Sequence, residues 1–108
     1  MKAKLYRHPK ALFDVEESAV YIGRDSPESA LRFIDAVEAT LGLIADNPAI
    51  GALRMHDRKG LLGLRAFPVQ DFDKHIVFYR RTERGIEVLR VLHGARDLPT
   101  IFDTAEAD

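Results

Sequence analysis

Residues 74–94, KHIVFYRRTERGIEVLRVLHG, contain two runs rich in β-branched and aromatic residues on either side of Thr82-Glu83-Arg84-Gly85. Such runs are typical of β-strands, and a short connection that ends in glycine is typical of a β-hairpin. A third run of the same kind, residues 63–69, precedes them. The sequence therefore predicts strands over residues 63–69, 74–80 and 86–92, of which the last two pair antiparallel.

In most of the N-terminal half, apolar residues recur at helical spacing rather than in strand-like runs. Residues 3–7 alternate small or apolar with basic residues, which predicts a strand, and His8-Pro9 ends it. Two amphipathic helices are expected next: one that stops at Gly23, and one that starts at Asp25-Ser26-Pro27-Glu28 and ends at Asp46-Asn47-Pro48. Their predicted core stripes are Leu12, Val15, Ala19 and Ile22 in the first helix, and Ala30, Phe33, Ile34, Val37, Leu41 and Ile44 in the second.

The order of these elements determines the expected architecture. One strand, a helical hairpin and three further strands predict an α+β domain, in which the hairpin packs on one face of a mainly antiparallel sheet of about four strands. Residues 50–62 lack a clear period and contain two glycines, so we interpret them as a loop. A chain of 108 residues suits a single domain over residues 1–108, with a short C-terminal tail from about residue 99.

The composition excludes several classes of protein. There is no cysteine, which excludes disulfides and thiolate metal sites, and there is no apolar run long enough to cross a bilayer. His8, His56 and His75 lack the spacing of metal ligands, and no phosphate-binding glycine loop or Gly-x-Ser-x-Gly motif occurs. We therefore expect a cytoplasmic protein without a metal, a cofactor or a membrane contact.

The net charge of -1 conceals an uneven distribution. Residues 10–51 carry three basic and eight acidic side chains, whereas residues 52–96 carry ten basic and five acidic ones. The predicted helical region is thus acidic and the predicted sheet region basic. A basic sheet is either a solvated face or a surface for an acidic partner, and charge alone does not choose between them.

Arg90 stands in the middle of an apolar strand. If Leu89 and Val91 point toward the helices, strand alternation sends Arg90 to the opposite face of the sheet. Val88 and Leu92 then share that face with it. A buried arginine needs either an internal acid or an external anion, and we favour the external anion for Arg90 with the internal acid as the alternative.

Arg65 is a second candidate on the same predicted face. It belongs to the neighbouring strand, where its guanidinium either contributes to a binding surface or pairs with Asp71 or Asp73. Both interpretations stay open.

His93 and Arg96 lie on either side of Gly94, just after the last predicted strand. Together they could bind a phosphate or a carboxylate. The alternatives are a packed or hydrogen-bonded His93 and a local ion pair between Arg96 and Asp97.

Six short pieces of the chain match a known family in their order and spacing. They are Val20-Tyr21-Ile22, Ser26-Pro27-Glu28-Ser29-Ala30-Leu31-Arg32-Phe33-Ile34, Asn47-Pro48-Ala49-Ile50-Gly51, Gly63-Leu64-Arg65, Ile76-Val77-Phe78-Tyr79-Arg80 and Val88-Leu89-Arg90-Val91-Leu92-His93-Gly94-Ala95-Arg96-Asp97-Leu98. With these pieces, the sequence resembles the ParE branch of the RelE/ParE toxins of bacterial type II toxin–antitoxin systems over nearly the whole chain.

The resemblance implies a small cytoplasmic toxin that poisons DNA gyrase and so blocks replication. A ParD-like antitoxin from the same operon would neutralise it, and operator DNA would be contacted only through that antitoxin. The resemblance implies no cofactor, and we expect no catalytic residue. The expected target-binding residues are Arg65, Arg90, His93 and Arg96.

Two alternatives stay open. The other branch of the superfamily consists of ribosome-dependent mRNA endonucleases, which need basic groups around the scissile phosphate and a base or acid for the 2′-hydroxyl. Two departures weaken this alternative: no tyrosine follows His93, and the loop before the predicted strand over residues 63–69 has one lysine, Lys59, rather than a lysine cluster. The other possibility is an inactive relative that retains only antitoxin binding.

Three apolar residues lie off the core stripe or among acids in the predicted helices. Phe13 and Val20 share a face of the first helix with charged residues, and Leu31 lies among acidic residues on the second. We expect all three to be exposed and to bind an amphipathic antitoxin helix, while the basic sheet attracts acidic antitoxin residues. The alternative is that they are isolated exposed apolar residues without a partner.

Overall fold

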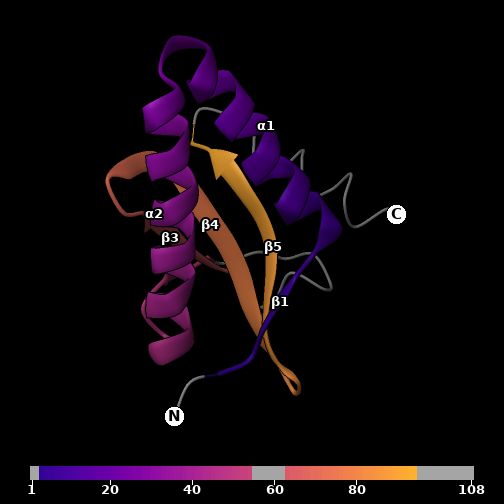
Figure 1. Ribbon diagram of the computed structural model, residues 1–108. Helices are drawn as coiled ribbons and strands as arrows, with labels where there is room; N and C mark the ends of the chain where they lie inside the picture. The colour runs from indigo at the N-terminus through magenta and orange to yellow at the C-terminus, as the bar shows by residue number, and fades with distance from the viewer. Residues whose placement is uncertain (1–2, 55–62, 95–108) are drawn as a thin grey trace.

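The structure, a computed structural model, describes residues 3–54 and 63–94 of the chain. Two helices pack on one face of a sheet that has five strands in this part of the chain (Figure 1). The elements are β1 (Leu5–Arg7), α1 (Pro9–Asp25), α2 (Pro27–Asp46), β2 (Ala52–Leu53), β3 (Arg65–Val69), β4 (Phe72–Thr82) and β5 (Gly85–His93). The predicted α+β class is confirmed, with five strands in place of about four.

The sheet has the strand order β1-β5-β4-β3-β2. β1 runs parallel to β5, and the other neighbouring pairs are antiparallel, including the predicted hairpin of β4 and β5. β2 pairs with β3, so the interpretation of residues 50–62 as a loop is wrong at Ala52–Leu53. A strand of two residues is too short for an alternating pattern to reveal it.

The two helices meet at Ser26. This residue ends α1 and caps α2, where its Oγ accepts a hydrogen bond from the Ser29 N–H at 3.2 Å. The prediction that the first helix stops at Gly23 is wrong, because α1 continues to Asp25, before the Ser-Pro step that disfavours helical backbone at Ser26. Gly23 instead lies against Ala30 of α2: a Cβ on Gly23 would be 3.4 Å from the Ala30 Cβ.

The main core lies between the helices and the sheet. Its large, fully buried side chains are Phe33, Val37, Leu41 and Ile44 of α2 and Val69, Val77, Tyr79, Ile86, Val88 and Val91 of the sheet. Two predicted stripe residues are exposed, since Leu12 is 47% exposed and Ile34 is 39% exposed. Spacing of three and four fixes a helix face only to within one residue, or about 100°. Here Ala11 faces the core in place of Leu12, and of the two neighbours predicted in α2, Phe33 faces the core and Ile34 does not.

A β-bulge in β5 changes which residues face the helices. Val88 and Arg90 pair with consecutive residues of β4, so Leu89 has no partner there. Alternation restarts after the bulge, and Val88 and Val91 both pack in the helix-side core. The predicted sides of Leu89 and Val88 are therefore wrong, whereas those of Val91 and Leu92 are confirmed.

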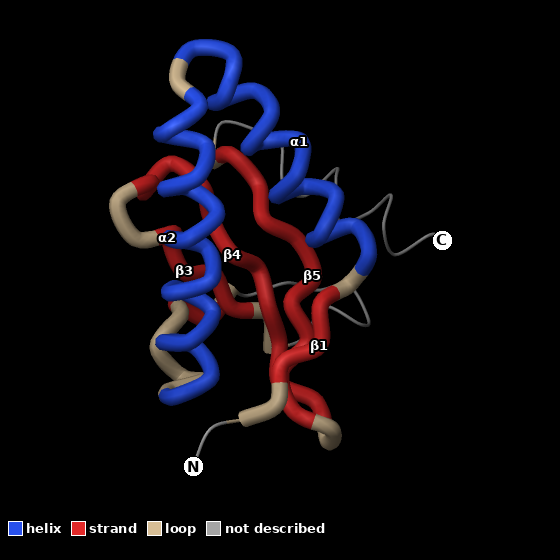
Figure 2. Tube along the Cα trace, viewed as in Figure 1, coloured by secondary structure: helices blue, strands red, loops and turns tan. Residues whose placement is uncertain are grey.

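The face of the sheet away from the helices carries a second, smaller cluster. Its buried members are Leu64, Phe78 and Leu92, and Ala66, Ile76 and Leu89 pack against them. Figure 2 shows both helices on the other side of the sheet and the β4–β5 turn at the end of the molecule opposite the α1–α2 connection. Within the described residues, neither helix is long and apolar enough to cross a membrane.

Candidate functional site

One edge of β5 is only partly covered by β1. The two strands pair as far as Arg7 and Val88, after which the chain turns into α1, and the rest of this edge faces that helix. The carboxylate of Asp14 in α1 takes the place of a neighbouring strand, because its Oδ2 accepts a hydrogen bond from the Val91 N–H at 3.0 Å. A buried backbone donor is thereby satisfied.

Arg90 pairs with the same carboxylate. Its Nε and Nη2 donate to the two oxygens of Asp14 at 2.8 and 2.9 Å, and the side chains are 15% and 5% exposed, respectively. The hydrogen bond to Asp14 raises the pKa of Arg90 above its ordinary value, although burial acts in the opposite direction. Arg90 therefore meets an internal acid, and its guanidinium reaches α1 instead of the far side of the sheet.

Arg65 bonds the chain segment that follows α2. Its Nη1 donates to the carbonyl oxygen of Gly51 at 2.8 Å and to that of Ala49 at 3.4 Å. Among the described residues, these carbonyls take the place of Asp71 and Asp73, the acids considered as partners from the sequence. Arg65 thus fixes the connection from α2 to the edge of the sheet.

Tyr79 of β4 holds the same segment from inside. Its buried hydroxyl donates to the carbonyl oxygen of Pro48 and accepts from the Gly51 N–H, both at 2.8 Å. Burial raises the pKa of Tyr79, so the hydroxyl keeps its proton and remains a donor at neutral pH. A Cβ on Gly51 would be 2.6 Å from the Tyr79 hydroxyl oxygen, which explains why glycine occupies this position.

His93 is exposed at the end of β5 and lies opposite His75 of β4. The two rings are nearly perpendicular, with centroids 5.2 Å apart, and His75 also packs on Phe33 of α2 at 4.8 Å. Burial, and secondarily the nearby His93, lowers the pKa of His75 and favours its neutral form. Within residues 3–54 and 63–94, no three His, Asp or Glu side chains are placed to hold a metal ion.

The predicted target-binding residues make separate contacts in the described part of the chain. Arg65 contacts the segment after α2, Arg90 contacts α1, and His93 contacts a histidine of β4. Arg96, the fourth, lies outside the described residues. The candidate site is therefore the C-terminal end of β5, with His93 as its exposed basic group.

Two residues that shape this region are missed by the sequence analysis. Asp14 lies on the buried face of α1 between Ala11 and Ala19, and an acid in such a position indicates an internal partner. Tyr79 lies inside an apolar strand, where a buried hydroxyl likewise needs hydrogen bonds. Both signals are present in the sequence, but neither identifies the partner.

The exposed face of the helices is apolar in places. Phe13, Val20 and Leu31 are 61, 63 and 65% exposed, which confirms their predicted exposure. Between the helices lies a pocket of about 180 Å³ lined by Arg7, Ala11, Leu12, Val15, Glu16, Ile34, Val37, Leu41, Val88 and Val91. Val20 lies about two turns after Leu12 on α1, and Leu31 lies about one turn before Ile34 on α2, so the exposed apolar residues are distributed along both helices.

The chain is similar to known proteins in both sequence and fold. A family model described as the ParE toxin of the type II toxin–antitoxin system parDE matches residues 5–98. Among solved structures, a chain of the chromosomal ParDE toxin–antitoxin system from P. aeruginosa superimposes with a TM-score of 0.68 at 19% sequence identity, covering 85% of this chain and 96% of that one. At that identity the likeness shows a shared fold. No curated protein matches the chain.

Proposed function

Because the chain belongs to the ParE toxins of type II toxin–antitoxin systems, we propose that it inhibits DNA gyrase and that a cognate ParD-like antitoxin neutralises it. The observation that carries the proposal is the family match over residues 5–98, which spans every described helix and strand. The likeness to a chain of a ParDE system supports the same fold. In this proposal the toxin acts in the cytoplasm and meets operator DNA only through its antitoxin.

We assign target binding to the C-terminal end of β5. His93 is exposed there, and Arg96 follows it in the sequence. Arg90 and Arg65 belong to the same function as positioning residues, because each donates to an internal partner: Arg90 to a carboxylate of α1 and Arg65 to carbonyls after α2. The contacts of Arg90 stabilise β5 and those of Arg65 stabilise β3, and both strands belong to the sheet that carries His93.

The antitoxin is assigned to the apolar face of the helices. Leu12 and Ile34 line the pocket and are themselves exposed, and Phe13, Val20 and Leu31 are further exposed apolar residues of the same two helices. An amphipathic helix recognises such a groove by inserting apolar side chains at helical spacing. Val20→Asp or Leu31→Asp is expected to weaken antitoxin binding about tenfold or more, whereas Glu83→Ala, in the exposed β4–β5 turn, serves as a control.

The test of the target is a supercoiling assay with purified DNA gyrase and increasing amounts of the full-length protein. We expect lost supercoiling and trapped cleaved DNA, both reversed by the antitoxin. His93→Ala and Arg96→Ala should reduce inhibition, and the exposed Arg24→Ala should not. Full gyrase activity in the presence of folded toxin would contradict the proposal, and mRNA cleavage on ribosomes would then be assayed.

A further inference from the structure

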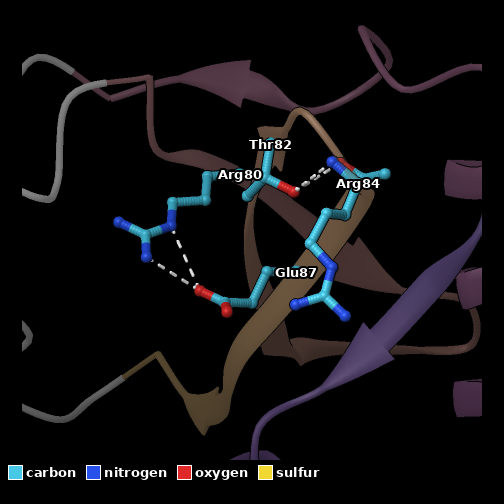
Figure 3. Close-up of polar contacts among 5 residues, drawn as sticks. Arg80, Thr82, Arg84 and Glu87 are labelled. Atoms are coloured by element: carbon cyan, nitrogen blue, oxygen red, sulfur yellow. Dashed lines mark hydrogen bonds and ion pairs between the residues drawn. The ribbon is translucent and has the colours of Figure 1, made fainter.

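The end of the sheet at the β4–β5 turn gathers basic side chains, and Figure 3 shows two of them, Arg80 and Arg84. Leu5 and Ile86 pair with each other and pack in the helix-side core, so the next residues, Tyr6 and Glu87, face the other side. Arg80 pairs with Glu87 across the hairpin and shares that face. We name this region the hairpin tip; it comprises Lys4, Tyr6, Arg80, Thr82, Glu83, Arg84 and Glu87, whereas Arg81 pairs with Ile86 and lies on the helix side.

Arg84 lies over the ring of Tyr6. Its guanidinium carbon is 5.3 Å from the ring centroid, which is a cation–π distance. Arg84 is exposed and Tyr6 is 37% exposed. The two side chains therefore present an aromatic ring and a planar cation together to solvent.

The backbone beneath this pair is fixed by hydrogen bonds. The carbonyl oxygen of Lys4 accepts from the Ile86 N–H at 2.8 Å, and Gly85, at a φ of 137°, lies so close that a Cβ would be 2.5 Å from that oxygen. The Thr82 hydroxyl accepts from the Arg84 N–H at 3.2 Å, as Figure 3 shows. The hairpin tip therefore presents its side chains from an ordered turn, which reduces the entropy lost on binding.

Charge is separated between the two layers of the molecule. The hairpin tip carries three basic and two acidic side chains, and one of the acids, Glu87, already pairs with Arg80 at 2.9 Å. Residues 10–51, which form the helices and the start of the following segment, carry eight acidic and three basic side chains. A polyanion near the molecule is therefore repelled by the helices and attracted to the hairpin tip.

We propose that the hairpin tip binds single-stranded nucleic acid, with phosphates at Lys4 and Arg84 and an unpaired base stacked against Tyr6 and Arg84. Guanidinium groups match the geometry of phosphate oxygens, and exposed aromatic rings stack on unpaired bases. An acidic peptide would engage the cations and leave the ring unused, so the exposed ring favours a nucleic acid. The inference is independent of gyrase inhibition and of antitoxin binding.

The test is fluorescence anisotropy of labelled single-stranded DNA and RNA of one sequence, each about 20 nucleotides long, titrated with the full-length protein alone at several salt concentrations. Arg84→Gln is expected to lower the affinity and to reduce the slope of log affinity against log salt by about 0.7, the value for one lost phosphate contact. Tyr6→Leu should lower the affinity about fivefold or more with little change in that slope, and Tyr6→Phe, which keeps the ring, should bind like the wild type.

Arg24→Gln is the matched control, because Arg24 is an exposed arginine of the helical layer. It should bind both oligonucleotides like the wild type, and circular dichroism should show that every variant is folded. Binding of either oligonucleotide that is weakened by Arg84→Gln and Tyr6→Leu supports the proposal. If DNA and RNA bind with different affinities, the tighter one identifies the preferred sugar. No binding at low salt overturns it, as does competition by polyglutamate combined with wild-type affinity of Tyr6→Leu, which would identify a surface for acidic peptides.

Discussion

Arg90 and Arg84 lie toward opposite ends of the region formed by β5 and its preceding turn, and their charges are compensated in different ways. Arg90 is 15% exposed and forms a bidentate pair with Asp14 of α1. Arg84 is exposed and lies over Tyr6. An arginine among apolar residues in a sequence indicates a candidate binding residue. Burial of its guanidinium in the folded protein, however, makes an internal partner necessary. The arginine of the exposed turn keeps its charge accessible to another molecule.

The largest loss of stability is expected when Asp14, the buried partner of Arg90, is removed. Asp14→Ala leaves the Arg90 guanidinium and the Val91 N–H without their acceptor, which should lower the free energy of unfolding by about 3–5 kcal/mol. Urea denaturation measures this loss. Asp14→Leu combined with Arg90→Met removes both charges and should recover part of it. A loss below about 1 kcal/mol for Asp14→Ala would mean that the pair behaves like one at the surface.

A smaller loss of stability is expected when the buried hydroxyl of Tyr79 is removed. Tyr79→Phe removes the hydroxyl that bonds Pro48 and Gly51, so two backbone groups lose a partner and the free energy of unfolding should fall by about 1–3 kcal/mol. Urea denaturation of Tyr21→Phe is the control, because Tyr21 is 70% exposed. Equal midpoints for the two variants would show that water replaces the lost hydroxyl.

The elements of this fold could be predicted because their patterns are local. Runs rich in β-branched and aromatic residues on either side of Thr82–Gly85 predict the β4–β5 hairpin, and the Ser-Pro pair at residues 26–27 marks the start of α2. The bulge at Leu89 could not be predicted, because it depends on the register between two strands. A single unpaired residue then reverses the faces assigned to its neighbours.

The partners in the candidate site could not be predicted either, because they come from distant parts of the chain. Arg90 and Asp14 are 76 residues apart, and Arg65 reaches carbonyls of the segment after α2. The pairing of His93 with His75 likewise follows from strand register. Sequence patterns identify which side chains need a partner, whereas the packing of α1 on the sheet determines which partner each one finds.

The stability of the protein should depend on pH through His75. Burial lowers the pKa of His75 in the folded state below its ordinary value of 6.5, so the unfolded chain takes up a proton first as the pH falls. The free energy of unfolding is thus fully retained above that value and decreases from about pH 6.5 downward until the folded-state pKa is reached. Urea denaturation of the wild type and of His75→Gln between about pH 7.5 and 5.5 measures the difference. Curves that stay parallel over this range would show that His75 does not contribute.

The smallest effect is expected at Arg7 and Glu38, an ion pair that is also joined by two hydrogen bonds, here from the two Nη atoms of the arginine. Its two hydrogen bonds are 2.6 Å long, but the side chains are 35 and 51% exposed. The hydrogen bond to Arg7 lowers the pKa of Glu38, yet water and salt screen the attraction, so Glu38→Ala should cost about 0.5 kcal/mol or less.

Denaturation at low and high salt separates the two pairs. Added salt should abolish the small effect of Glu38→Ala, because its charges face solvent. The same salt should leave most of the effect of Asp14→Ala, because that variant loses hydrogen bonds in a dry environment. Since both pairs join an arginine to an acid with two hydrogen bonds, burial is the main variable between them. If Asp14→Ala and Glu38→Ala lowered the free energy of unfolding by equal amounts at both salt concentrations, the assignment of Arg90 as an internally compensated residue would be contradicted.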